Sequence, residues 1–560
     1  MTGDSTPSHS PALRVPTFTR LFSTRLRINL TDKRSQFDHT GSIFIEVHLS
    51  GSADLKKKDL KGIMTHSNYE RLTATDNAFL IFETPKLHMH VSSTMIFEAH
   101  ALTRADGGID FDRIKRATEG YLHKIPRYRQ KLHFIPIENH AVWVDDKNFN
   151  LDYHVRHTAL PKPGSEEQLK RLSARIMAQP LDRSRPLWEA WVIEGIEGDR
   201  FALITKLHHC MIDGNSGVDL AQIMMSPTAD RSLPEIPPYT PRPRPSRSEL
   251  FRDEIVRRVS LPLKALEGLR AFTDETDDLL AELTSRAKIL WHTIGAGLTP
   301  SETPLNGQPS HHRKFDWLEV SLDDIKALRR GLECSVNDIV LTVVTGAVRE
   351  FMQLRGVDPE RISFKISAPV SVRTEEEQGK LGNRVSSWIF ELPIHEADPR
   401  KQLNHIHSLT QDFKNTNQAL GISMIMRVAE WTPASLLSLG AQATNGPINS
   451  IVTNVPGPQF PLYLQGAKLL SAFPQVPLLG EMGIGIALMS YNGRVCWGFN
   501  ANPDVMHDLD LFVELIEKSL KAMGDLCGIE LTHRDSDRTH LPKRDAAKVA
   551  SRNPSRVQRL

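Results

Sequence analysis

The chain has 560 residues, more than one hydrophobic core usually organises, so we expect two domains or one large pseudo-symmetric fold. Its 40% hydrophobic and 24% charged residues are ordinary for a soluble globular protein, and a net charge of +2 gives no reason to expect nucleic-acid binding. We find neither an apolar run of the ~18 residues that span a bilayer nor an ordered signal peptide. Any membrane contact is therefore predicted to be peripheral.

The cysteines point to a reducing compartment. None of the four lies in a CxxC pair or at any other metal-ligand spacing: Cys210, Cys334, Cys496 and Cys527. This scatter predicts reduced thiols in a cytoplasmic protein, with neither a disulfide framework nor a structural zinc.

Both ends of the chain differ from its middle. Residues 1–63 show no sustained periodicity. We expect either a disordered extension there or a start site assigned too early, because the sequence changes in character from Met64 onward. Acidic residues within this stretch argue against a transit peptide. The polar and basic tail at 533–560 is also expected to be disordered.

Residues 64–226 alternate between helical and strand periodicity, which predicts an N-terminal α/β domain. The expected elements are a capped helical turn over 72–82, strands over 89–99, 149–157 and 187–193, and helices over 111–125 and 169–177.

A strand over 201–207 ends in two adjacent histidines, His208 and His209. Asp213 and Gly214 then favour a turn before a helix that begins near Val218. Because side chains alternate on a strand, the two imidazoles are expected to point apart. One would be free to act, and the other would be structural.

Residues 227–310 are predicted to be a linker. Six prolines between 234 and 245 prevent a central strand or helix, and helical spacing follows over 248–272, interrupted at Pro262. From 242 to 270 there are eight Lys/Arg against four Asp/Glu. The segment is either a crossover helix packed on the domains or a basic amphipathic helix on an anionic membrane.

A C-terminal domain is predicted over 311–532. A capping box at Ser335 and Asp338 opens a helix with a buried face, and Asn492-Gly493 is a favoured hairpin turn. The other expected elements are helices over 321–330 and 512–523 and strands over 364–370, 386–392, 484–489 and 495–499.

His209 is the candidate base, because an imidazole can take a proton from an alcohol or a thiol near neutral pH. Asp213 can fix the ring or brace the loop. The alternative is a core histidine followed by a turn aspartate, but the full HHxxxDG string after an apolar strand favours function. Zinc is not expected at this pair, because His208 and His209 diverge and no third ligand has suitable spacing.

Other chemistries find little support. Strand alternation turns Cys210 away from His209, which argues against a cysteine nucleophile. The chain has no GxSxG or GxxxxGK[ST] string, and the glycines of MGIGIAL lack the spacing of a dinucleotide site. Direct transfer between two bound substrates is the simplest remaining reaction.

Two further features can serve such a reaction. Asn337 lies in the first turn of its helix, where an amide can help hold an oxyanion, although it can equally be a residue of the helix start alone. Pro186, Leu187 and Trp188 can line an apolar channel, but a tryptophan near a strand start is commonly a core residue.

These strings together resemble the bacterial wax ester synthase/acyl-CoA:diacylglycerol acyltransferase family. The resemblance covers residues 64–528 and rests on HHCMIDG (208–214), RPLWE (185–189), SVNDIV (335–340) and NVPGP (454–458). HHxxxDG alone is shared with condensation domains of peptide synthetases and other CoA-dependent acyltransferases. Its combination with the other three strings is specific.

The resemblance implies an α/β two-domain fold like chloramphenicol acetyltransferase, with a tunnel at the interface. It implies acyl transfer from acyl-CoA, as co-substrate, to diacylglycerol or a long-chain alcohol, without a further cofactor or a metal. Its motifs assign His209 as general base, Asp213 as architectural partner, His208 as support and Asn337 as oxyanion donor. Pro186, Leu187, Trp188 and Gly214 are assigned to substrate binding.

Two other functions stay open at this point. One is a condensation-type acyltransferase that uses a carrier-protein thioester, and the other is a non-catalytic protein of the lipid-droplet surface. For the favoured function we expect a cytoplasmic enzyme that associates peripherally with a membrane or a lipid droplet.

Overall fold

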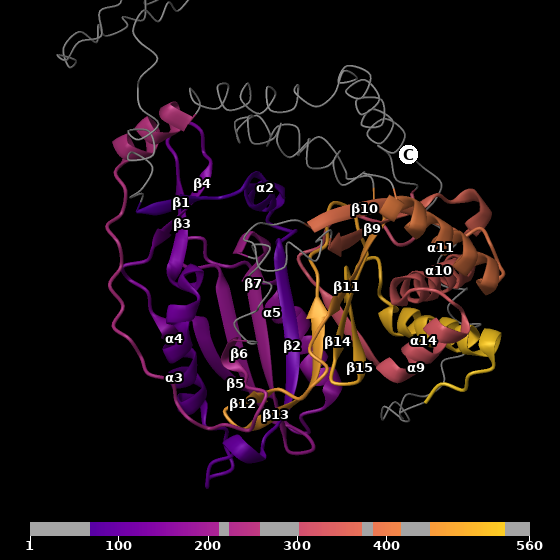
Figure 1. The fold of residues 1–560 in the computed structure, drawn as a ribbon, viewed down its shortest axis with the longest axis horizontal. Helices are drawn as coiled ribbons and strands as arrows, with labels where there is room; N and C mark the ends of the chain where they lie inside the picture. The colour runs from indigo at the N-terminus through magenta and orange to yellow at the C-terminus, as the bar shows by residue number, and fades with distance from the viewer. Residues whose placement is uncertain (1–67, 212–222, 258–301, 372–384, 416–447, 533–560) are drawn as a thin grey trace, which may run out of the picture. The chain divides into compact units, whose positions relative to one another are not determined.

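A computed structural model gives the fold of the chain (Figure 1) and describes residues 68–211, 223–257, 302–371, 385–415 and 448–532. The predictions for 1–63, for Asp213, Gly214 and the helix near Val218, and for 533–560 lie outside the described residues.

The first half is built on a six-stranded sheet with the order β12-β13-β2-β7-β6-β5. Its strands are β2 (His90–Glu98), β5 (Val155–Ala159), β6 (Trp188–Ile196), β7 (Arg200–His208), β12 (Tyr463–Leu464) and β13 (Ala467–Gln475). Strands β2 and β7 are antiparallel, and their register places His90 opposite His208. The histidine strand therefore lies in the middle of a sheet, where its backbone is held on both sides.

Helices and a small sheet complete this half. A three-stranded sheet of order β1-β4-β3 joins β1 (Tyr69–Arg71), β4 (Ala141–Asp145) and β3 (Gln130–Phe134). The helices are α2 (Ala74–Phe82), α3 (Phe111–Tyr121), α4 (Leu151–His154) and α5 (Glu166–Ala178). Short 3₁₀ turns are η1 (His100–Leu102), η2 (Leu122–Lys124), η3 (Pro126–Arg129) and η4 (His209–Met211). Figure 1 shows α2 next to the ends of β2 and β7.

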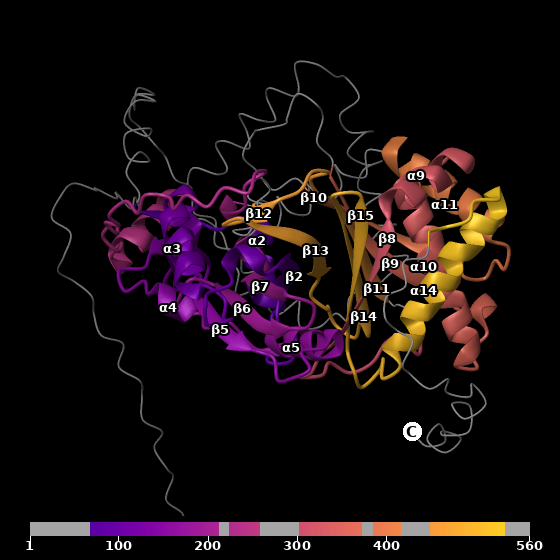
Figure 2. The same cartoon turned by 90° about the horizontal axis from the view of Figure 1, so that it is seen from below.

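The second half carries another six-stranded sheet, with the order β10-β9-β11-β14-β15-β8. Its strands are β8 (Lys314–Ser321), β9 (Phe364–Ser371), β10 (Val385–Leu392), β11 (Ser450–Pro456), β14 (Ile484–Tyr491) and β15 (Arg494–Ala501). The helices are α9 (Leu322–Gly331), α10 (Val336–Leu354), α11 (Pro399–Asn415) and α14 (Leu509–Cys527), and η5 (Pro359–Arg361) is a 3₁₀ turn. Figure 2 shows these four helices gathered on one side of the sheet.

Strand β13 links the two halves. It follows β11 in the chain, yet it pairs with β2 of the first sheet, with Ala472 opposite Met95. Phe473 of this strand stacks on Trp317 of β8, with ring centroids 4.6 Å apart. The predicted domain boundaries do not anticipate this exchange, because strand pairing between distant segments leaves no local pattern in the sequence.

Most predicted elements are confirmed, but 149–157 is not a single strand. Its first part is α4, where the Asn150 side chain accepts the backbone N–H of Asp152, and only Val155 onward is a strand. One capped helical turn followed by a strand gives the same mixture of apolar and polar residues as a half-buried strand. The cap decides between the two.

The predicted linker contains one described helix. Residues 229–246 have no helix or strand, and 247–257 are helical, while the predicted continuation to 272 lies outside the described residues. Leu250 of this helix is fully buried and packs with Ile135, Val142 and Val144. One face of the predicted crossover helix is therefore packed on the first half.

Within the described ranges, no single helix is both long and apolar enough to cross a membrane. The pair α9 and α10, bent by 95°, meets such a test only together.

Candidate active site

His209 lies in the turn directly after β7. It is the first residue of η4, and its backbone N–H donates to the Met89 carbonyl over 2.7 Å. Its ring stacks on Phe79 of α2, with centroids 3.9 Å apart and 22° between the planes. The residue stays partly exposed. The start of β2 and helix α2 together fix the direction of this imidazole.

The environment of His209 keeps its imidazole neutral. Burial lowers the pKa of His209 to about 4, and neighbouring His208 disfavours the charged form further. Its buried Nδ1 atom has no hydrogen-bond partner among the described residues. At neutral pH the ring is therefore an unprotonated base, as general-base catalysis requires.

His208 is buried and contacts different groups from those around His209. Its Nδ1 accepts the backbone N–H of Cys210 over 3.2 Å, and its Nε2 lies 3.5 Å from Glu83 Oε2. The first contact places the ring proton on Nε2, directed at the carboxylate. This geometry suits the supporting role predicted for His208. The two imidazoles diverge as predicted, although a 3₁₀ turn and not strand alternation separates them.

Glu83 is the residue that sequence reasoning missed. It caps the end of α2 and receives Arg183 Nε over 3.0 Å, besides its contact with His208. Burial raises the pKa of this carboxyl, but the neighbouring His208, His88 and Arg183 outweigh it and hold the pKa well below its usual value. Two histidines, His88 and His90, flank the same carboxylate, and their i, i+2 spacing in the sequence was the available signal.

Cys210 is a core thiol. Its side chain is buried, and this burial raises the pKa of the Cys210 thiol well above its usual value. A thiol of this kind supplies little thiolate for nucleophilic attack. The sequence argument used strand alternation, but Cys210 lies within η4, so its protonation state is the better reason.

The predicted substrate-binding residues Pro186, Leu187 and Trp188 are all buried. The Leu187 carbonyl accepts the backbone N–H of His208 over 2.9 Å. The Trp188 indole N–H donates to the Tyr128 carbonyl, and its ring stacks on His154 at 4.6 Å. These residues support the histidine strand from the side of β6. Their contact with substrate stays a prediction.

Asn337 is placed by the first turn of α10, as predicted. Ser335 caps the helix and forms a capping box with Asp338. The exposed side chain of Asn337 accepts from Asn454 Nδ2 through its Oδ1 over 2.8 Å. Its own Nδ2 has no hydrogen-bond partner among the described residues and can donate to a bound oxygen.

Asp338 differs from the neighbouring Asn337 in burial and contacts. It is fully buried and accepts from Thr410 Oγ1 and contacts His407 Nδ1, each over 2.8 Å. Burial raises the pKa of Asp338, but these contacts and the N–H of Ser335 outweigh it and lower the pKa. The aspartate ties α10 to α11, and Asn337 is left as the exposed polar group.

A cavity of about 350 Å³ opens beside Asn337. Asn454 and the apolar side chains of Val340, Trp388 and Val452 are among its lining. Its lining combines apolar side chains with polar ones such as Ser335 and Thr410, and such a mixture can accommodate a lipid chain with a reactive polar end. No hydrogen bond or ion pair between described residues joins Asn337 to His209.

The loop after Asn454 depends on one glycine. A Cβ atom on Gly457 would lie 2.3 Å from the Ser490 carbonyl oxygen, and the Gly457 N–H donates to Ser490 Oγ over 3.2 Å. Only glycine lets the end of β11 pass this close to β14. The NVPGP string thus holds Asn454 in its place beside Asn337.

Two protein-family models match the chain. The wax ester synthase/diacylglycerol acyltransferase catalytic domain matches residues 72–340, and the corresponding C-terminal domain matches 381–524. Together they include both histidines, Asn337 and Asn454. The chain belongs to this family. It is an acyltransferase, as the sequence resemblance predicted.

Individual proteins agree with this assignment. The Mycobacterium tuberculosis protein tgs1, named as a diacylglycerol O-acyltransferase, is 32% identical over 409 residues, which are 71% of this chain and 85% of that protein. The solved wax ester synthase/diacylglycerol acyltransferase from Marinobacter aquaeolei VT8 is 24% identical, with a TM-score of 0.56, covering 82% of this chain and all (100%) of that one.

The fold extends beyond the family. The first condensation domain of the CDA synthetase is 14% identical and has a TM-score of 0.51, covering 83% of this chain and 99% of that domain. The likeness confirms the predicted mixed α/β two-domain architecture of CoA-dependent acyltransferases and condensation domains. At this identity it shows the fold alone.

Proposed function

We propose that this enzyme transfers a long-chain acyl group from acyl-CoA to the hydroxyl of diacylglycerol, forming triacylglycerol. Long-chain alcohols are second acceptors and give wax esters. The observation that carries the proposal is the neutral, partly exposed imidazole of His209 at the family's histidine motif. The name of the relative tgs1 supports diacylglycerol as acceptor, and that of the Marinobacter protein supports both acceptors.

The reaction needs no covalent enzyme intermediate. His209 takes the proton of the acceptor hydroxyl as the oxygen attacks the thioester carbonyl. The carbonyl oxygen gains negative charge, and the Nδ2 group of Asn337 donates to it. Collapse of the tetrahedral intermediate expels the CoA thiolate, which takes the proton back from the His209 imidazolium. The products are the new ester and free CoA.

The donor distinguishes this proposal from its nearest alternative. A condensation-type enzyme would use a carrier-protein thioester. We therefore expect triacylglycerol from palmitoyl-CoA and dioleoylglycerol, and little from palmitoyl-carrier protein at equal concentration. The reverse preference would support the condensation-type reaction. No turnover with either donor, together with lipid coating by the same protein, would support a non-catalytic surface protein.

The pH dependence follows from the lowered pKa of His209. Because the active form of His209 is neutral and its pKa lies at about 4, protonation should remove activity only in acid. We expect kcat/KM to be flat between about pH 5.5 and 8 and to fall with a slope of one proton below it. Enzyme returned from acid to pH 7 serves as the control for unfolding. An inflection near pH 6.5 would mean that the ring titrates like a solvated histidine.

We further propose that the enzyme binds lipid surfaces through a peripheral patch made of Phe134, Ile137, Phe251, Ile255 and Val256. These apolar side chains are 37–87% exposed. Phe134 and Ile137 lie at the β3–β4 turn, and the other three lie on helix 247–257, whose Arg257 contacts Glu138 of that turn over 3.6 Å. The patch supports the predicted peripheral association, because apolar residues flanked by arginines favour anionic interfaces.

A triple variant tests this patch. Replacing Ile137, Phe251 and Ile255 by glutamate should lower binding to vesicles of phosphatidylcholine, phosphatidylserine and dioleoylglycerol by about 100-fold or more in flotation, since each buried large apolar side chain contributes roughly 1.5–3 kcal/mol. Leu354→Glu is the control, because Leu354 is 50% exposed at the end of α10, away from the patch. Unchanged flotation of the triple variant would contradict the proposal.

A further inference from the structure

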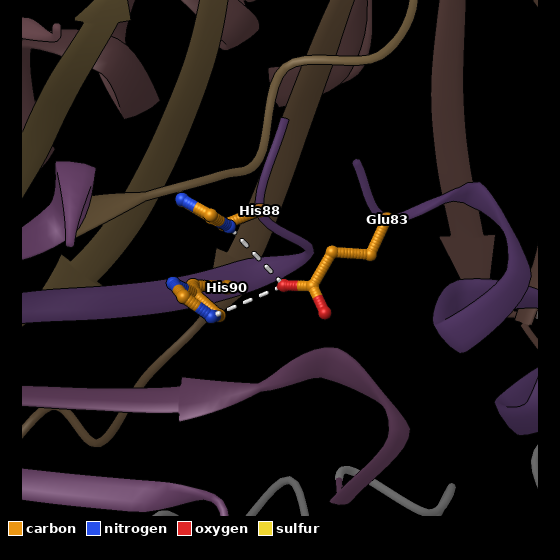
Figure 3. A group of neighbouring side chains, drawn as sticks. All are labelled: Glu83, His88 and His90. Carbon is orange, nitrogen blue, oxygen red and sulfur yellow. Dashed lines mark ion pairs between the residues drawn. The ribbon is translucent and has the colours of Figure 1, made fainter. Parts of the chain in front are cut away.

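Three side chains near His209 form a possible metal site that the catalytic chemistry does not use. Glu83 follows α2, His90 is the first residue of β2, and His88 lies two residues before it (Figure 3). In Figure 3 the two imidazoles lie side by side and point toward the carboxylate. One ligand atom from each lies within 4.8 Å of the others. We call these three residues the Glu83 cluster.

The spacing within the Glu83 cluster suits a bound cation better than hydrogen bonds. Glu83 Oε1 lies 3.4 Å from His88 Nδ1 and 3.5 Å from His90 Nε2. Charge-assisted hydrogen bonds between these groups are about 2.7–2.9 Å long. Two ligand atoms on one tetrahedral zinc, each bonded at about 2.0–2.1 Å, lie about 3.4 Å apart. The observed distances match the second geometry.

His90 adds an independent observation. Its side chain is fully buried, and neither ring nitrogen has a hydrogen-bond partner within the described part of the chain. Buried polar atoms in proteins nearly always have a partner, so an unpaired imidazole needs an explanation. One of its two nitrogens, Nε2, is aimed at Glu83. A metal ion bound at this nitrogen would supply the missing interaction.

The surrounding charges narrow the kind of metal. Arg183 binds the other carboxylate oxygen, Glu83 Oε2, and so leaves Oε1 to face the histidines. Because Arg183 also binds this carboxylate, we expect the imidazole nitrogens to provide much of the affinity. Imidazole favours zinc and similar transition metals, whereas magnesium and calcium favour a shell of oxygen ligands.

We propose that Glu83, His88 and His90 bind one zinc-class divalent cation, with water in the fourth position. The ion would join the end of α2 to the start of β2. These are the two segments that hold His209, through the stack on Phe79 and the hydrogen bond to the Met89 carbonyl. The sequence argument against zinc concerned the pair His208 and His209, and the proposed site uses neither.

The test is metal binding by the tag-free, full-length protein. The protein is treated with EDTA, supplied with Zn²⁺ and desalted, and its metal content is measured by mass spectrometry. We expect one zinc per chain. Saturating Zn²⁺ should raise Tm by about 5 °C. The variants His88→Gln and Glu83→Gln should lose both effects. His140→Gln is the matched control, because His140 is a buried histidine outside the cluster, and it should keep both.

Two results would overturn the proposal. One is wild-type protein that retains no zinc and shows no Tm change, and the other is His88→Gln that still binds one zinc per chain. The His88 side chain is 11% exposed, so its variant is expected to fold even if a His90 variant does not. Either result would leave acyl transfer by His209 untouched, because the ion takes no part in that reaction.

Discussion

Replacing His209 by alanine is expected to lower kcat for transfer of palmitate from palmitoyl-CoA to dioleoylglycerol by at least about 100-fold. In the proposed mechanism the variant loses the group that takes the hydroxyl proton. The fold should survive, because the ring is partly exposed and its main packing contact is one stack on Phe79. Such a stack contributes about 1 kcal/mol, so Tm should fall by no more than about 3 °C.

Phe79→Leu is the matched control for that substitution. It removes the stacking contact but keeps the base, so it should retain much more activity than His209→Ala at a similar cost in Tm. Near-normal turnover of His209→Ala, with Phe79→Leu equally active, would show that another group removes the proton.

The second large effect is expected at Asn337. Asn337→Ala should lower kcat by about 100-fold or more, the usual loss when one oxyanion donor is removed. Asn337→Asp should be as inactive, because it keeps an acceptor for Asn454 but has no N–H to donate and carries negative charge. Since Asn337 is exposed, Tm should hardly change.

Replacing the neighbouring residue, Asp338, is expected to affect stability instead. Asp338→Ala leaves the N–H of Ser335 without its acceptor and removes the buried carboxylate contacts to Thr410 and His407, which together cost about 3 kcal/mol. Thermal unfolding should therefore show a clear loss of stability. If Asn337→Ala instead lost stability and kept its turnover, Asn337 would be a residue of the helix start and not an oxyanion donor.

Local signals explain what the sequence predicted well. Ser335 and Asp338 form the predicted capping box, and the turn residues Asn492 and Gly493 have φ values of 44° and 81°, as their hairpin requires. Each pattern involves residues within a few positions of one another. Interactions between residues so close in the sequence can be predicted directly from the order of residues.

Long-range pairing explains what could not be predicted. The exchange of β13 into the first sheet joins Ala472 to Met95, and no spacing rule connects positions so far apart. Glu83 meets His208 for the same reason, because their contact depends on how α2 packs against η4. The histidine motif located the proposed base, but only the fold identifies the groups that contact it.

The roles of the remaining site residues were predicted from the family resemblance. Residues alone left open whether Asn337 merely starts its helix and whether Trp188 is a core residue. The structure shows Trp188 buried and Asn337 exposed with a donor group to spare. The two residues therefore differ in exposure, although both belong to motifs of the same family.

Direct transfer between bound substrates is the central claim, and the most direct test is a single-turnover experiment with the acceptor withheld. Wild-type enzyme is mixed with palmitoyl-CoA alone, and intact-mass spectrometry and free CoA are followed before and after dioleoylglycerol is added. We expect no added palmitoyl mass and no CoA release until the acceptor arrives, and then one CoA for each triacylglycerol. A palmitoyl-enzyme adduct formed with release of CoA before the acceptor is added would contradict the account.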